Sequence, residues 1–112
     1  NRLYNMFLIA PQTLDERIQK IDSISNGFIY MVSSSSITGS KNSFSPEQIN
    51  YFERIEKMNL KTPRIIGFGV GDKQTFNTVV KNSKGAIIGS AFIKNLHENG
   101  IDSIASYIGS IR

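Results

Sequence analysis

Two glycine-containing turns carry the chemistry that is easiest to interpret in this sequence. Gly67-Phe68-Gly69-Val70 and Gly89-Ser90-Ala91 each follow an apolar run and each precede a segment with helical spacing of apolar residues. Glycine at the start of a helix lets an anion approach unpaired backbone N–H groups, and the positive end of the helix dipole attracts it. The two turns therefore predict a phosphate site built from backbone donors, without a cationic side chain.

The elements that position these turns alternate between strand and helix. Continuous apolar or β-branched runs predict buried parallel strands at residues 6–10, 28–32, 63–68 and 85–88. Helical spacing follows each strand, and a final helix is expected from about residue 103 to residue 111. Four strand-helix units with right-handed crossovers predict an α/β fold with a parallel sheet.

Capping patterns predict where three of the helices begin. Thr13 with Glu16, and Ser45 with Gln48, have the spacing of a capping box. Asp72 stands where an N-cap is expected after the second glycine of the first turn. The carboxylate of Asp72 is therefore expected to cap a helix and not to act as an acid catalyst.

The predicted strand ends carry few groups that could catalyse a reaction. Active sites in parallel α/β folds lie at the carboxyl ends of the strands, here residues 11–13, 33–40, 67–72 and 89–90. These segments contain no histidine, cysteine or glutamate, and their one carboxylate is Asp72. His97 lies in a polar stretch and is expected on the surface. No catalytic residue and no metal site is predicted.

A serine-rich segment at residues 33–43 follows the second predicted strand. Its length and composition suit either a lid that closes over a site or a flexible surface loop, and composition alone does not separate the two.

Length and composition restrict the remaining classes. The chain has 112 residues, about half of the roughly 250 that an eight-fold barrel needs. Its 13 basic and 9 acidic residues are dispersed, which argues against nucleic-acid binding. It has no cysteine and no apolar run long enough to span a membrane, so a cytoplasmic location is expected.

The order of the motifs gives a more specific prediction. They are Phe7–Pro11, Phe28–Ser33, Ile37-Thr38-Gly39, Gly67–Val70 and Gly89–Lys94. In this order and spacing they resemble the C-terminal half of the tryptophan synthase alpha chain family. The resemblance implies that residues 1–112 are the last four β/α units of a single (β/α)8 TIM barrel domain, with no internal boundary.

The resemblance also implies an activity. The family is a lyase of tryptophan biosynthesis that cleaves indole-3-glycerol phosphate to indole and glyceraldehyde 3-phosphate, without a cofactor, in an alpha2-beta2 assembly with a beta chain. Its two catalytic acids come from the half of the barrel that is absent here, so this piece alone is expected to be inactive.

Roles for individual residues follow from the same resemblance. The implied phosphate donors are Gly39, Gly69, Gly89 and Ser90; Tyr30 and Phe68 are implied to line the substrate pocket, and Thr38 to support a lid. The chain departs from the family pattern at Ser34 and Ser36 in the lid, and at Gly71, where a serine is frequent.

Two other functions fit the glycine turns. One is a noncatalytic module that binds phosphate ligands on a flavodoxin-like sheet, with helices on both faces. The other is a different phosphate-binding barrel enzyme, such as an isomerase or synthase. If the chain is half of a barrel, the open half is expected to leave two strand edges unpaired, near residues 6–10 and 86–88, and to expose apolar residues.

Overall fold

The structure is a computed structural model that describes residues 3, 5–33, 44–67 and 69–112. Within them, strands β1 (Phe7–Ile9), β2 (Ile29–Val32), β3 (Arg64–Gly67) and β4 (Gly85–Ile87) form one parallel sheet. The helices are α1 (Asp15–Ile24), α2 (Pro46–Lys57), α3 (Lys73–Val80), α4 (Ser90–Asn99) and α5 (Ile104–Ile111), with a short 3-10 helix η1 (Ile101–Ser103) before α5. The four predicted strands are confirmed.

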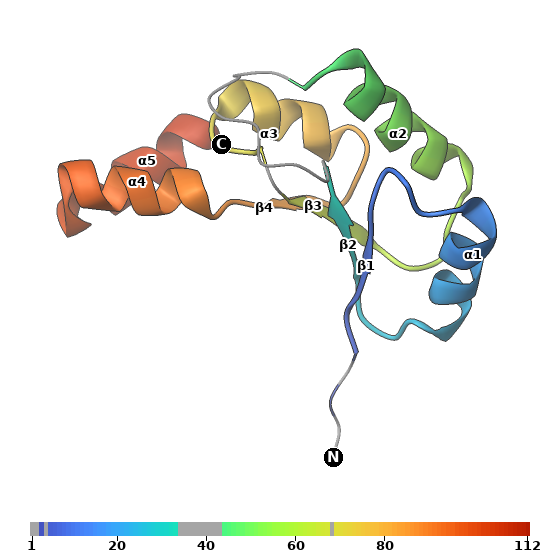
Figure 1. Ribbon diagram of the computed structural model, residues 1–112. Coiled ribbons are helices and arrows are strands. Elements are labelled where there is room, and N and C mark those ends of the chain that lie inside the picture. Colours follow the sequence, from blue (N-terminus) through green and yellow to red (C-terminus); the bar gives the residue numbers. More distant parts are fainter. Residues whose placement is uncertain (1–2, 4, 34–43, 68) are drawn as a thin grey trace.

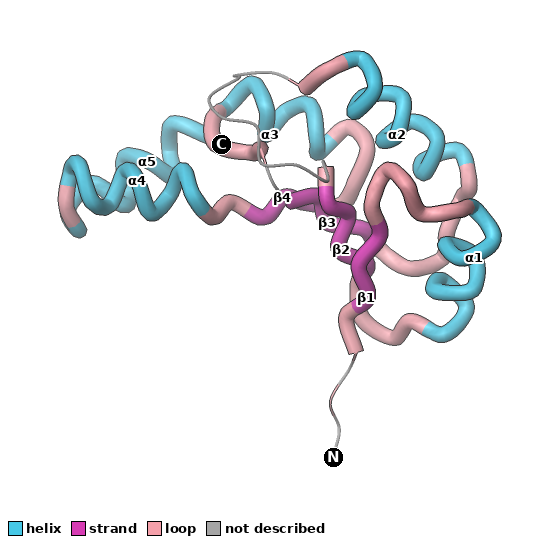
Figure 2. The backbone as a smooth tube through the Cα atoms, in the orientation of Figure 1, coloured by secondary structure: helices cyan, strands magenta, loops and turns pink. Residues whose placement is uncertain are grey.

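The strand order is β1-β2-β3-β4, the same as the order along the chain. Figures 1 and 2 show α1, α2 and α3 along one side of the curved sheet, while α4 and α5 extend beyond β4. Consecutive order with helices on one face is the arrangement of a barrel segment. In a doubly wound sheet, the order of the strands would reverse at a switch point, and helices would cover both faces. The flavodoxin-like alternative is therefore not what the chain forms.

The core lies between the sheet and α1–α3. Alternate strand residues point toward these helices, because successive side chains of a strand face opposite ways. Eight of the core side chains are at most 1% exposed: Ile9, Ile29, Met31 and Ile66 from the sheet, and Ile18, Phe52, Ile55 and Val79 from the helices. Burying one such side chain stabilises the fold by roughly 1.5–3 kcal/mol.

The opposite face of the sheet is not covered by any described helix. Leu8, Tyr30, Ile65 and Gly85 are aligned across the four strands on this face. Leu8 is 56% exposed, although it is a central residue of its strand. Among the described strands, β1 and β4 each pair on one side only. An open barrel was expected to have these edges and this exposed apolar face.

The helix starts agree with two of the three capping predictions. The Ser45 hydroxyl accepts a hydrogen bond from the third residue of α2, and Asp72 caps α3 in the same way. The prediction for Thr13 is wrong, because α1 begins after Leu14, which makes no side-chain cap. The Thr13 hydroxyl instead accepts a hydrogen bond from the Ala10 amide at 2.9 Å and so closes the turn after β1. Within the described residues, no helix is long and apolar enough to cross a membrane.

Candidate functional site

The two glycine turns meet at the carboxyl ends of β3 and β4. A Cβ atom on Gly71 would lie 2.8 Å from the Cβ of Ala91, in the first turn of α4. Two Cβ atoms do not approach so closely, so the absence of a side chain at Gly71 lets the loop after β3 contact the start of α4. Tyr107, on α5, fixes the same loop by donating its hydroxyl to the Gly71 carbonyl at 3.1 Å.

The environment of Tyr107 joins this loop to α5. Burial raises the pKa of Tyr107, and the negative charge of Asp72 raises it further. The phenol therefore remains protonated and keeps its donor at neutral pH. Phe92 of α4 packs edge-on against the Tyr107 ring, with centroids 6.1 Å apart. Three segments, the loop after β3, α4 and α5, thus hold one another in place.

Gly69 has a backbone conformation that few other residues adopt. Its φ angle is +81°, in the left-handed region that glycine enters without steric cost. A Cβ there would lie 3.2 Å from the Phe44 ring and 3.7 Å from the Ser33 hydroxyl. Ser33, at the end of β2, is 1% exposed and donates its amide to the Gly67 carbonyl at 3.0 Å. The exposed Gly69 turn therefore lies next to the carboxyl ends of β2 and β3.

Some backbone donors of the first turn are used by the fold itself. The amides of Gly71 and Asp72 donate to the Thr75 hydroxyl at 3.0 Å and 3.2 Å. In return, the Thr75 amide donates to the Asp72 carboxylate at 2.8 Å. These two amides and the carboxylate are therefore occupied by the cap of α3. Val70 is only 4% exposed, so the exposed Gly69 remains the candidate donor of this turn.

The start of α4 offers free donors in the second turn. The first hydrogen bond of the helix runs from the Ile93 amide to the Gly89 carbonyl, 3.1 Å apart. The amides of the first turn, beginning with Ser90, consequently have no acceptor within the helix. Gly89 and Ser90 are both exposed, and no atom of the described residues lies within 4 Å of a Cβ built on Gly89. An anion can therefore reach these amides and the Ser90 hydroxyl without displacing any described residue.

Tyr30 lies on the uncovered face of the sheet, across Gly67. A Cβ on Gly67 would lie 2.2 Å from the phenol oxygen and 2.5 Å from Cζ of the Tyr30 ring. The glycine at position 67 is therefore needed to accommodate an aromatic ring. The sequence had suggested that glycine there serves the approach of a ligand. The half-buried Tyr30 side chain stands close to the strand ends that carry the glycine turns.

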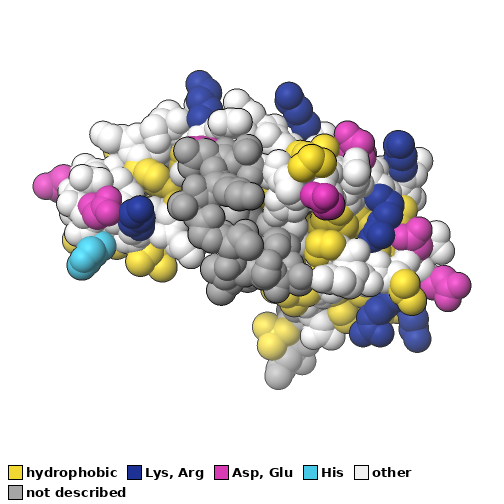
Figure 3. Space-filling view, turned by 45° about the horizontal axis from the view of Figure 1, so that its top comes forward, with side chains coloured by type: hydrophobic (Ala, Val, Ile, Leu, Met, Phe, Trp, Pro, Cys, Tyr) yellow, Lys and Arg dark blue, Asp and Glu magenta, His cyan; other side chains and the backbone are white. Residues whose placement is uncertain are grey.

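The remaining predicted positions divide into two groups. Thr38, Gly39 and Phe68 lie outside the described residues, as do Ser34 and Ser36. His97 is exposed in the last turn of α4, as expected, and no group of three or more potential metal ligands occurs in the part of the chain that the structure describes. Lys and Arg side chains on the face shown in Figure 3 are interspersed with acidic ones and form no continuous stripe.

Sequence reasoning did not identify three residues that shape the site. Thr75 follows Asp72 at the spacing of a capping box, so its role was open to prediction from the sequence. Phe44 and Tyr107 lie 25 and 36 residues from the glycines that they contact, and no local pattern indicates such pairs.

Comparison with known proteins identifies the family. A family model described as "Tryptophan synthase alpha chain" matches residues 1–108. The chain belongs to the tryptophan synthase alpha chain family. The alpha chain of Flavobacterium psychrophilum is 62% identical over 109 residues, which are 97% of this chain and 43% of that relative. The alpha chain of Bacteroides fragilis is 48% identical over 93 residues, 83% of this chain and 35% of the relative.

Solved structures of this family have the same fold. The alpha subunit from Pyrococcus furiosus superimposes with a TM-score of 0.78 at 25% identity, over 97% of this chain and 44% of that one. Tryptophan synthase from M. tuberculosis, in an aminoacrylate-bound form, gives a TM-score of 0.74 at 25% identity, over 98% and 39% of the two chains. The parallel sheet is thus part of a (β/α)8 barrel. The chain spans less than half the length of the relatives it matches.

Proposed function

We propose that this chain is the phosphate-holding side of a tryptophan synthase alpha chain, a lyase that cleaves indole-3-glycerol phosphate to indole and glyceraldehyde 3-phosphate. The contact between Gly71 and Ala91 carries the proposal, because it brings the two glycine turns together at one end of the sheet. In barrel enzymes, the loops after the last two strands commonly form a phosphate site. We assign residues 1–112 to the C-terminal half of one barrel domain.

Each residue of the site then has a role. The backbone N–H groups of Gly69, Gly89 and Ser90 bind the phosphate, and the Ser90 hydroxyl adds a further donor. No lysine or arginine is needed, because the helix dipole of α4 supplies the positive potential. Tyr30 lines the pocket on the uncovered face of the sheet, where its ring offers apolar area to the indole or glycerol portion.

Three further assignments rest on the resemblance to the family. Gly39 adds a phosphate donor, Phe68 lines the pocket beside Tyr30, and Thr38 closes a lid over the substrate. These residues lie outside the described part of the chain.

The chain supplies binding but not proton transfer. At the strand ends that the structure describes, the one carboxylate is that of Asp72, which caps α3. Cleavage of a carbon–carbon bond needs groups that remove and donate protons at the reacting atoms. We assign these to two acids in the remaining part of the barrel, so that the 112-residue chain alone is inactive.

The expected partners follow from the family. We propose that the complete alpha chain passes indole to a beta chain in an alpha2-beta2 assembly in the cytoplasm, and that it needs no cofactor of its own.

A hybrid protein tests the proposal. In it, this chain replaces the matching segment of the Flavobacterium psychrophilum alpha chain, and indole release from indole-3-glycerol phosphate is measured. We expect activity in the hybrid and none in the 112-residue chain. Gly89→Asp should raise KM strongly, because a carboxylate then stands where the phosphate binds.

Gly109→Asp is the matched control, since a Cβ at Gly109 also meets nothing within 4 Å in the part of the chain that the structure describes. It should leave KM unchanged. Equal kinetics of the two variants would contradict the phosphate assignment, and an inactive hybrid with a native circular dichroism spectrum would contradict the proposed function.

A further inference from the structure

A cavity lies at the opposite end of the sheet from the glycine turns. It has a volume of about 290 Å³ and is bounded by the end of α2, by residues 60–64 leading into β3, and by residues 80–84 between α3 and β4. These segments enter the strands, so the cavity is at their amino ends. The substrate phosphate site proposed above is at the carboxyl ends. The two sites are therefore at opposite ends of the barrel strands.

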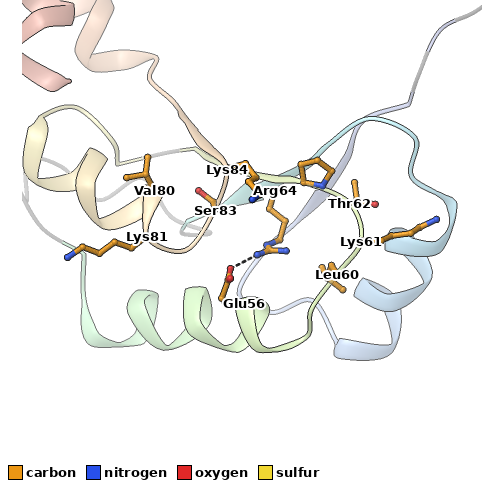
Figure 4. Close-up of a pocket in the computed structure, with 10 residues that line it drawn as sticks. Glu56, Leu60, Lys61, Thr62, Arg64, Val80, Lys81, Ser83 and Lys84 are labelled. Carbon is orange, nitrogen blue, oxygen red and sulfur yellow. Dashed lines mark hydrogen bonds and ion pairs between the residues drawn. The ribbon is translucent and has the colours of Figure 1, made fainter.

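The lining of this cavity is strongly basic. Lys61, Arg64, Lys81 and Lys84 contribute four positive charges, and Glu56 contributes one negative charge. Figure 4 shows Lys84 beside Arg64 at the edge formed by the strands, whereas Lys61 and Lys81 project outward on two different sides. Arg64 and Lys84 are thus placed to contact a ligand directly, and the other two lysines raise the local positive potential.

Arg64 is the buried anchor of the cavity. Its side chain is only 10% exposed, and its Nη2 donates to the Glu56 carboxylate. Its Nε is buried and has no hydrogen-bond partner among the described residues. A guanidinium group has five N–H donors, and a buried one is costly unless its charge is well paired. Glu56, whose side chain is 53% exposed, pairs with Nη2 and leaves Nε without an acceptor among the described residues.

We propose that the cavity binds a small, multiply charged anion of the phosphate class, held by Arg64 and Lys84. The planar guanidinium group matches the oxygen atoms of phosphate. The lining residues carry a net excess of three positive charges, and the Asp22 carboxylate, which accepts hydrogen bonds from the amides of Lys61 and Thr62, reduces this excess to two. Such an excess favours a dianion over a monoanion. This site is independent of the glycine turns and of the proposed lyase reaction.

A titration with inorganic phosphate tests the site. Backbone amide resonances of the 112-residue chain and of the hybrid are followed by NMR, with chloride added to keep the ionic strength constant. Saturable shifts are expected for Thr62, Lys81, Ser83 and Lys84. Equal concentrations of acetate should produce much smaller shifts at these amides, because acetate carries a single charge.

Charge variants give effects of opposite sign. Lys84→Gln should weaken phosphate binding about threefold or more, since it removes one charge at close range. Glu56→Gln should tighten binding, because it removes the carboxylate that competes for Arg64. Lys20→Gln is the matched control: Lys20 is an exposed lysine of α1 that does not line the cavity, so affinity should not change.

Two results would overturn the inference. One is the absence of saturable shifts at the cavity amides in the hybrid. The other is an equal effect of Lys84→Gln and Lys20→Gln. Shifts at Gly69, Gly89 and Ser90 report on the glycine turns instead, so failure of either site is recognised separately.

Discussion

The contact between Tyr30 and Gly67 predicts a large effect from the addition of one methyl group. In Gly67→Ala, the new Cβ would lie 2.2 Å from the Tyr30 phenol oxygen, 2.5 Å from Cζ and 2.9 Å from Cε1. Ordinary contacts between carbon atoms are about 3.5–4.0 Å, so the ring must move by about 1 Å or more. Overpacking of this kind costs about 1–3 kcal/mol.

Gly85→Ala is the matched comparison. Gly85 also lies in a strand, yet a Cβ there meets no atom of the described residues within 4 Å. Replacing a glycine by alanine without strain stabilises a protein by about 0.4–1 kcal/mol, because it restricts the unfolded chain. The two variants should therefore shift the free energy of unfolding in opposite directions.

Urea denaturation of the hybrid, followed by circular dichroism, measures both changes. A double-mutant cycle with Tyr30→Ala then isolates the contact: removing the ring should relieve most of the cost of Gly67→Ala, with a coupling energy of about 1 kcal/mol or more. If Gly67→Ala is as well tolerated as Gly85→Ala, or if the coupling is near zero, the reasoning about this face of the sheet is refuted.

Three further predictions concern stability and are measured by urea denaturation of the hybrid. Burial tends to raise the pKa of Asp22, but hydrogen bonds from Thr62 and Lys61 and the charge of Lys61 outweigh it, so the pKa is lowered. Asp22 thus stabilises the fold above its ordinary pKa of 3.8, and this contribution is lost on acidification below that value. Asp22→Asn should therefore lower the free energy of unfolding by about 1 kcal/mol at neutral pH and remove its dependence on acid. Tyr51→Phe should leave stability unchanged or raise it by up to about 1 kcal/mol, because the Tyr51 hydroxyl is buried without a hydrogen-bond partner among the described residues. Asp72→Ala should cost about 1 kcal/mol through loss of the α3 cap, and a neutral result would contradict the assigned capping box.

Local patterns predicted the strands and most of the helix starts of this fold. Apolar runs located all four strands, and the pattern around Ser45 located the start of α2. The prediction for Thr13 failed because a hydroxyl can satisfy either the helix or the preceding turn, and here it accepts from Ala10. Sequence spacing alone does not show which of these two partners is used.

The candidate site was predicted only in outline. The glycine turns were visible in the sequence, but the different physical demands on their glycines were not. Gly69 has a positive φ angle, Gly67 accommodates the Tyr30 ring, and Gly71 allows contact with Ala91. These demands arise from residues distant in the sequence, so the pattern of glycines does not distinguish them.

The distribution of contacts supports the proposal that this chain can bind phosphate without catalysing the reaction. The glycine turns are held by contacts within the chain: Gly71 meets Ala91, Tyr107 donates to the Gly71 carbonyl, and Asp72 caps α3. None of these contacts depends on the uncovered face of the sheet, where Leu8 is 56% exposed. Proton transfer, in contrast, is assigned in our proposal to acids outside this chain. We therefore expect the 112-residue chain to bind glycerol 3-phosphate at Gly69, Gly89 and Ser90 while it releases no indole. Loss of that binding in the isolated chain, together with its recovery in the hybrid, would show instead that the turns depend on the rest of the barrel.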